Sequence, residues 1–110
     1  MATGAEEDGA VDFGYLEGFC AGDQQVIAEV LATFREQAVG WVEALAASDV
    51  DQREVAHTIK GSALGIGARR LGEAASRAEF DGPEMLGPVR VELEEAIAAI
   101  EGYLTRIGGG

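Results

Sequence analysis

The sequence is poor in cysteine and in aromatic residues, and both shortages restrict what the protein can be. Cys20 is the single cysteine among 110 residues, which excludes a disulfide or a thiolate metal site within one chain. A reducing, cytoplasmic setting is therefore expected. Aromatic residues make up 6% of the chain and apolar residues 47%, so the core has to be built from Ala, Leu, Ile and Val.

Long apolar runs and positive charge are also scarce. No run approaches the ~20 apolar residues that a membrane-spanning helix needs, and no signal segment opens the chain. The net charge of −12 repels nucleic-acid phosphates and anionic membranes, so neither is expected as a partner. The segment from Arg53 to Arg77 nevertheless carries five basic and two acidic residues, a net of +3 against −15 elsewhere. Ordinary surface variation explains this segment as well as a functional cause does.

Apolar residues recur at helical spacing, and no segment alternates with the period of two that a half-buried strand shows. The pattern predicts a short helix within 11–19 and longer helices at about 24–47, 52–66, 68–80 and from 84 or 89 to 106. Asp23 and Asp51 are suitable N-caps, Gly67 ends a helix, and Val26 begins the apolar stripe of the 24–47 helix. The expected fold is an all-α, antiparallel up-and-down four-helix bundle with a short extra N-terminal helix across one end.

This bundle is expected to be the only domain, covering residues 11–107. Residues 1–10 are small, acidic and glycine-bearing, and are expected to form a flexible tail; residues 108–110 are all glycine and are expected to be flexible too. A bundle with a polar exterior is expected to be a monomer, while Trp41 fits either the core or an interface.

His57, the only histidine, is expected to face water. With about 100° between successive helical residues, its side chain falls about 145° from the centre of the apolar face of its helix. That face comprises Val55, Ala56, Ile59, Ala63 and Ile66. The periodicity therefore disfavours the usual alternative for a lone histidine, a buried and hydrogen-bonded core residue, and leaves an unimportant surface residue as the other possibility.

The neighbours of His57 favour a functional role. Lys60 lies three residues on and can place its ammonium near a group attached to the ring. Gly61 and Gly65 stand inside the helix, where each costs about 1 kcal/mol relative to Ala, and their missing side chains let a partner approach. Leu64 is an apolar residue expected to be exposed on the same side, which suggests a docking surface.

Phosphoryl acceptance suits such a histidine better than other chemistries do. An imidazole free in water is mostly neutral and nucleophilic at pH 7. Metal binding is disfavoured because there is no second histidine, no spare cysteine and no His-Glu-x-x-His pattern. A hydrolase or a general acid–base catalyst needs a shaped pocket, for which a small bundle has little room. An acceptor in open solvent needs only in-line attack and a nearby cation, since the donor protein can supply the metal and the acid or base groups.

The segment His57-Thr58-Ile59-Lys60-Gly61-Ser62-Ala63, followed by Gly67-Ala68-Arg69-Arg70-Leu71, resembles the signature of histidine-containing phosphotransfer (HPt) domains. The resemblance covers about fifteen residues directly, and the order of the helices is similar. It implies a four-helix bundle that shuttles phosphoryl groups between receiver-domain aspartates in a multistep two-component phosphorelay. One departure is Ala75, where many members have a bulkier residue, and this affects packing rather than chemistry.

The resemblance also implies roles for individual residues. His57 is the phosphoacceptor, Lys60 stabilises the phosphoryl oxygens and Gly61 provides clearance. Glu79 falls where relatives often carry Glu or Gln directed at the ring nitrogen that is not phosphorylated; the alternative is a solvated Glu near a helix end. If Glu79 accepts that N–H, the other nitrogen is left free to attack.

The implied partners are receiver domains of response regulators or of hybrid histidine kinases. Docking is expected around Leu64, Gly65, Arg53 and Arg69, with the Arg69-Arg70 pair adding local attraction. No cofactor is expected on this chain, and Mg²⁺ is expected only on the receiver. The leading hypothesis is a phosphoryl carrier without autokinase activity, because no Gly-x-x-x-x-Gly-Lys loop is present. The alternatives are a non-catalytic helical adaptor that docks a receiver, and a fragment of a larger histidine kinase, which Met1 and the glycine terminus disfavour.

Overall fold

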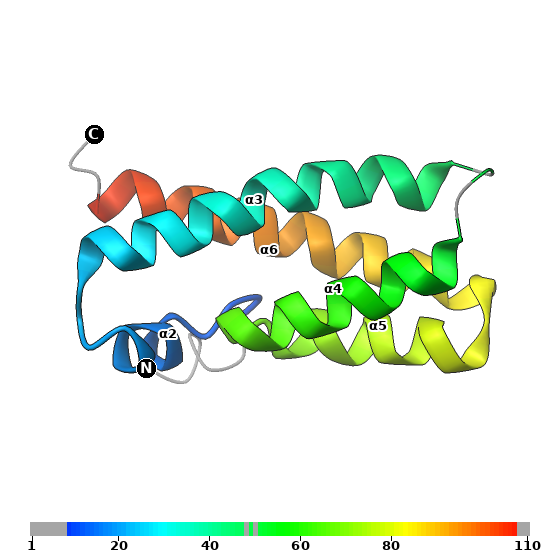
Figure 1. Cartoon of the computed structure of the whole chain (residues 1–110), viewed down its shortest axis with the longest axis horizontal. Coiled ribbons are helices and arrows are strands. Elements are labelled where there is room, and N and C mark those ends of the chain that lie inside the picture. The colour runs from blue at the N-terminus through cyan, green and yellow to red at the C-terminus, as the bar shows by residue number, and fades with distance from the viewer. Residues whose placement is uncertain (1–8, 48, 50, 108–110) are drawn as a thin grey trace.

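The computed structural model describes residues 9–47, 49 and 51–107, and this part of the chain is helical and contains no strand (Figure 1). The elements in chain order are α2 (Phe13–Phe19), α3 (Gln24–Ala46), α4 (Gln52–Ile66), α5 (Arg69–Asp81), the 3₁₀ turn η1 (Pro83–Met85) and α6 (Leu86–Ile107). Helices α3 to α6 run alternately in opposite directions along the long axis of the molecule (Figure 1). The predicted all-α, antiparallel four-helix bundle is confirmed.

Local signals explain most of the helix ends. The carboxylates of Asp23 and Asp51 accept hydrogen bonds from backbone N–H groups in the first turns of α3 and α4, as expected of N-caps. Gly67 ends α4 with a φ of 82°, a left-handed conformation that favours glycine. Helix α5 begins one residue later than predicted, at Arg69, and Ala68 at its N-cap offers no side-chain hydrogen bond.

The core consists of small and branched aliphatic side chains, as the shortage of aromatic residues requires. Its largest fully buried members are Leu16, Ile27, Leu31, Ile59, Leu71, Leu93, Ile100, Val11 and Val89. The placement of Val26 on the apolar stripe was wrong: its side chain is 40% exposed, because Ile27, one residue on, takes the inward position. Trp41 is half-buried at the edge of the core, with its ring edge-on to Phe34 at 5.6 Å between centroids.

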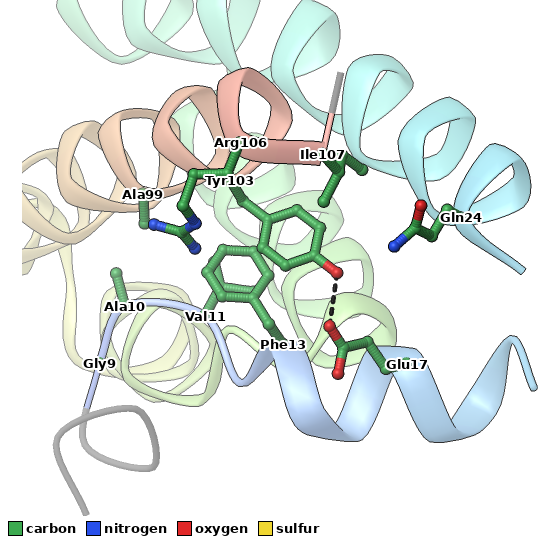
Figure 2. A pocket seen from close by; sticks show the side chains of 10 residues that line it. All are labelled: Gly9, Ala10, Val11, Phe13, Glu17, Gln24, Ala99, Tyr103, Arg106 and Ile107. Carbon is green, nitrogen blue, oxygen red and sulfur yellow. Dashed lines mark hydrogen bonds between the residues drawn. The ribbon is translucent and has the colours of Figure 1, made fainter. Parts of the chain in front are cut away.

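Helix α2 covers a part of the core that the shorter helices leave open. Helices α3 and α6 have 23 and 22 residues, whereas α4 and α5 have 15 and 13. At the end where α4 stops, the ring of Phe13 in α2 stacks on Tyr103 of α6 at 4.3 Å, and the Tyr103 hydroxyl donates to Glu17 at 2.6 Å (Figure 2). Burial raises the pKa of Tyr103 to about 12, and the hydrogen bond to the Glu17 carboxylate adds to the shift.

This end of the bundle also contains a hollow of about 620 Å³ (Figure 2). Its lining comes from the N-terminal segment, α2, the start of α3 and α6: Gly9, Ala10, Val11, Phe13, Glu17, Gln24, Ala99, Tyr103, Arg106 and Ile107. Ala10 packs against the core, although it was expected to belong to the N-terminal tail. Residues 1–8 of that tail and the C-terminal glycines lie outside the described residues. The hollow shares no residue with α4 or α5 and is thus separate from the surface around His57.

Candidate functional site

His57 lies near the middle of α4 and points away from the core, as predicted. Its side chain is 66% exposed, whereas Ala56 and Ile59 on the same helix are fully buried. Because α4 packs most extensively against α5 and is anchored along its inner face, the imidazole is presented on a rigid support. The ring is open to a partner in solution.

Glu79 reaches the imidazole from the neighbouring helix α5. Its Oε2 lies 2.7 Å from Nδ1 of His57, the length of a short, charge-assisted hydrogen bond. The side chain of Glu79 is only 14% exposed. A carboxylate has no proton to donate, so the proton of this hydrogen bond belongs to Nδ1. The neutral ring then carries its lone pair on Nε2, the nitrogen that does not contact Glu79. The structure therefore places Glu79 at the imidazole rather than in open solvent.

Lys60 lies beside the same carboxylate. Its Nζ is 3.8 Å from Oε1 of Glu79 and 5.5 Å from the ring centroid of Phe80, the residue that follows Glu79 in α5. The Oε1 atom is buried and has no hydrogen-bond partner among the described residues, so the nearby ammonium is what compensates its charge. His57, Glu79 and Lys60 thus form one cluster, which we call the His57 cluster, on the outer seam between α4 and α5.

The two mid-helix glycines leave the surface of α4 open. A Cβ atom built on Gly61 or on Gly65 would meet no heavy atom within 4 Å, so neither glycine is required by packing inside the described structure. Gly61 lies next to Lys60 on the exposed side of the helix. Gly65 lines a shallow hollow of about 420 Å³ between α4 and α3. Both therefore reduce the side-chain bulk on α4, Gly61 closest in sequence to the His57 cluster.

Leu64 and Arg69 belong to a second part of the surface, where α4 meets α2. Leu64 is 50% exposed and lies over Gly72 of α5, where an added Cβ would come within 2.8 Å of its Cδ2 atom. A hollow of about 190 Å³ is lined by Asp12, Tyr15, Leu64, Gly67 and Arg69. Tyr15 is 48% exposed and Phe19, whose ring is 6.3 Å away, is 74% exposed. We call Leu64, Tyr15 and Phe19 the apolar patch.

Arg53 lies on the other side of the His57 cluster. It lines a groove of about 450 Å³ together with Glu79 and Phe80, at the end of α5. Arg70, by contrast, is engaged within the bundle, because its guanidinium contacts Glu92 and Glu95 of α6 at 3.2 and 3.0 Å. The two carboxylates offset the charge of Arg70, and its part in local attraction stays a prediction. Arg69 is the member of that pair that borders the apolar patch.

Sequence reasoning missed Phe80, Tyr15, Phe19 and Gly72. Phe80 and Phe19 carry a detectable signal, since each is a large apolar residue at a position that faces solvent. Gly72 carried no such signal, because its contact with Leu64 joins two different helices.

Among the described residues, no three His, Cys, Asp or Glu side chains are grouped so that they could hold a metal ion. The arrangement offers one unhindered nucleophilic nitrogen beside a cation, and a cation-bearing seam of this kind can receive a phosphoryl group.

An exposed histidine on the surface of a helical bundle is the arrangement found in histidine phosphotransfer proteins, and this chain has that arrangement. The family model of the Hpt domain matches residues 25–105. The chain is also similar to the crystal structure of the histidine phosphotransferase ShpA from Caulobacter crescentus, with 44% sequence identity and a TM-score of 0.81; the match covers 91% of this chain and 95% of that one. A comparison with curated proteins gave no match.

The chain belongs to the Hpt family. It is a phosphotransfer protein of the phosphorelay type, and the alternative of a non-catalytic adaptor is not favoured. Hpt domains work with receiver domains of two-component systems. No helix in the described part of the chain has both the length and the apolar character needed to cross a membrane.

Proposed function

We propose that Nε2 of His57 accepts a phosphoryl group from the aspartyl phosphate of one receiver domain and passes it to the aspartate of another. The observation that carries this proposal is the 2.7 Å contact between Nδ1 of His57 and Oε2 of Glu79, made by a ring that is 66% exposed. Nδ1 is hydrogen-bonded to Glu79 of the same chain, and Nε2 is left available to a partner.

The transfer needs no base on this chain. The lone pair of Nε2 forms the N–P bond while the P–O bond to the donor aspartate breaks, and the aspartate leaves with the electron pair as a carboxylate. The proton on Nδ1 stays in place, so the phosphorylated ring carries a positive charge. In the second half, the carboxylate of the acceptor receiver attacks phosphorus and the N–P electrons return to Nε2. The same path runs in both directions.

Glu79 and Lys60 act on different charges in this reaction. The Glu79 carboxylate holds the proton on Nδ1 and stabilises the positive charge that the ring acquires on phosphorylation. The ammonium of Lys60 lies 3.8 Å from Glu79. The lysine side chain is flexible, so the ammonium can reach the incoming phosphoryl oxygens and offset their negative charge. Neither residue forms a bond to phosphorus, so both act by charge and orientation.

The receiver is proposed to dock on the apolar patch and over Gly61. Receivers carry acidic active sites and this chain has a net charge of −12, so the long-range attraction between them is poor. Short-range contact with the apolar patch compensates for this repulsion, and Arg53 and Arg69 border the approach on its two sides. The partners that fit are receivers of response regulators or of hybrid histidine kinases. Nucleic acid is not among them, because a chain this acidic repels phosphate backbones.

Three further expectations, on oligomeric state, location and cofactor, belong to the same proposal. We expect the chain to act as a monomer in the cytoplasm and to need no cofactor of its own, while Mg²⁺ is held by the receiver and supplies charge neutralisation there. The lone Cys20 supports a reducing compartment. Outside the apolar patch and Phe80, most exposed positions of the described helices are polar, which supports a monomer.

The test is transfer from a receiver phosphorylated with ³²P, with detection of acid-labile label on this chain. Wild type is expected to take up label, and His57→Gln is expected to take up none. Thr58→Gln is the matched control, because Thr58 is an exposed neighbour on the same helix and its change leaves the imidazole intact. Label retained by His57→Gln would refute the assignment. Loss of label in wild type with every receiver tried would favour the adaptor.

A further inference from the structure

Phe80 is the most unusual residue near the His57 cluster, because it is a large aromatic side chain that the core does not use. Phe80 is 67% exposed near the end of α5. Among the described residues, the one aromatic or cationic contact of its ring is with Lys60, whose Nζ lies 5.5 Å from the ring centroid. This separation is within the range of an attractive cation–π interaction.

The Glu79 carboxylate alone does not fix the position of Lys60. The distance of 3.8 Å between Nζ and Oε1 is longer than a hydrogen bond, so this contact pulls on the ammonium without directing it. A lysine held only by such a pull keeps most of its rotamer freedom. The ring of Phe80 supplies a second restraint from the adjacent residue of α5, and the ammonium is thereby confined between a carboxylate and an aromatic face.

We propose that Phe80 is a positioning residue for phosphoryl transfer, which holds the Lys60 ammonium beside His57 through the face of its ring. This inference rests on the proposed function of His57 and Lys60. Neither contact to the ammonium is a close hydrogen bond, so Lys60 can turn toward the phosphoryl oxygens without first breaking one. Phe80 does not touch the reacting atoms and acts through Lys60.

The assay that isolates this role uses phosphoramidate, a small-molecule donor that phosphorylates histidine without any receiver. The nitrogen–phosphorus bond of phosphoramidate breaks as Nε2 of His57 attacks phosphorus, and ammonia leaves. Docking plays no part in this reaction, so an effect of Phe80 on it cannot come from apolar contact with a partner. The measured quantity is the second-order rate constant for formation of phosphohistidine, followed by ³¹P NMR.

Phe80→Leu keeps apolar bulk but removes the aromatic face, and Phe80→Tyr keeps the face. We expect Phe80→Leu to slow labelling about two- to fivefold, the range that an exposed cation–π contact supports, and Phe80→Tyr to retain the wild-type rate. In a Lys60→Met background, Phe80→Leu is expected to have no further effect, because the residue on which it acts is gone. Circular dichroism and thermal unfolding are the checks on folding, and each variant is expected to be folded because Phe80 is exposed.

Two results overturn the inference while leaving the proposed function intact. The first is a rate in Phe80→Leu equal to that of wild type, and the second is equal slowing by Phe80→Leu with and without Lys60. A different failure concerns His57 itself: a wild-type chain that takes no label from phosphoramidate or from phosphorylated receivers overturns the proposed function, and the role of Phe80 falls with it.

Discussion

Replacing Glu79 with Ala tests the physical core of the proposed mechanism. The substitution removes the carboxylate that accepts from Nδ1 of His57 at 2.7 Å. Without it, the proton of the neutral ring is free to occupy Nε2, where it blocks the lone pair, and the positive charge formed on phosphorylation loses its partner. Lys60 loses the carboxylate at 3.8 Å as well. All three effects slow the transfer.

The size of the loss follows from the strength of the bond. A hydrogen bond to a charged group contributes about 1.5–3 kcal/mol, which corresponds to a rate factor of about 10 to 150. The imidazole is 66% exposed and water replaces part of the lost interaction, so the lower end applies. We expect Glu79→Ala to reduce the rate about 10- to 30-fold. Glu79→Gln keeps an acceptor oxygen but loses the charge, and is expected to fall between Glu79→Ala and wild type.

The assay is single-turnover transfer from an excess of phosphorylated receiver, quenched on the millisecond timescale and followed by the loss of label from the receiver. Glu73→Ala is the matched control, since Glu73 is an exposed glutamate on the same helix. It is expected to transfer at the wild-type rate. If Glu79→Ala is folded and transfers within twofold of wild type, the argument that Glu79 sets the tautomer and balances the charge is refuted.

Two further predictions concern the glycines of the bundle and the buried tyrosine. Gly61→Leu is expected to raise stability by up to about 1 kcal/mol, because helix propensity improves in open space, and to slow transfer by obstructing the receiver; Gly102→Leu on α6 should stabilise similarly without slowing it. Since the pKa of Tyr103 is raised from 10.0 to about 12, its contribution to stability is complete below pH 10 and is lost as the pH rises toward 12. The free energies of unfolding of wild type and Tyr103→Phe, measured in urea, should converge between pH 10 and pH 12.

Contrary results for these two predictions are easily recognised. Equal transfer rates in Gly61→Leu and Gly102→Leu would remove the clearance argument, whatever their stabilities. A difference in unfolding free energy between wild type and Tyr103→Phe that stays constant from pH 9 to 12 would show that the hydroxyl does not titrate as its burial requires.

The fold could be predicted because its signals are local. Asp23, Asp51 and Gly67 each mark a helix end through their own side chain or their own backbone conformation, and the structure follows all three. The orientation of His57 followed from the same kind of reasoning, since the apolar positions of α4 leave only one side for the core. Val26 shows the limit, because adjacent apolar residues compete for one inward position and periodicity alone does not choose between Val26 and Ile27.

The candidate site was less predictable because its contacts join different helices. The hydrogen bond between His57 and Glu79 spans 22 residues of sequence, and only the family resemblance pointed to it. The ion pairs of Arg70 with Glu92 and Glu95 of α6 depend on how α5 and α6 pack, and no residue spacing within α5 predicts them. The contact of Lys60 with Phe80 has the same origin. Contacts between side chains on different helices could therefore be identified only from the structure.

The proposed mechanism requires the phosphoryl group to be on Nε2 of His57, and NMR of the phosphorylated chain with ¹⁵N-labelled histidine identifies the nitrogen that carries it. With a single imidazole in the protein, the spectrum contains one pair of ring nitrogens to assign. We expect coupling to phosphorus at Nε2 and a retained proton on Nδ1. Phosphorus on Nδ1, or a phosphorylated chain whose imidazole signals are unchanged, would contradict it.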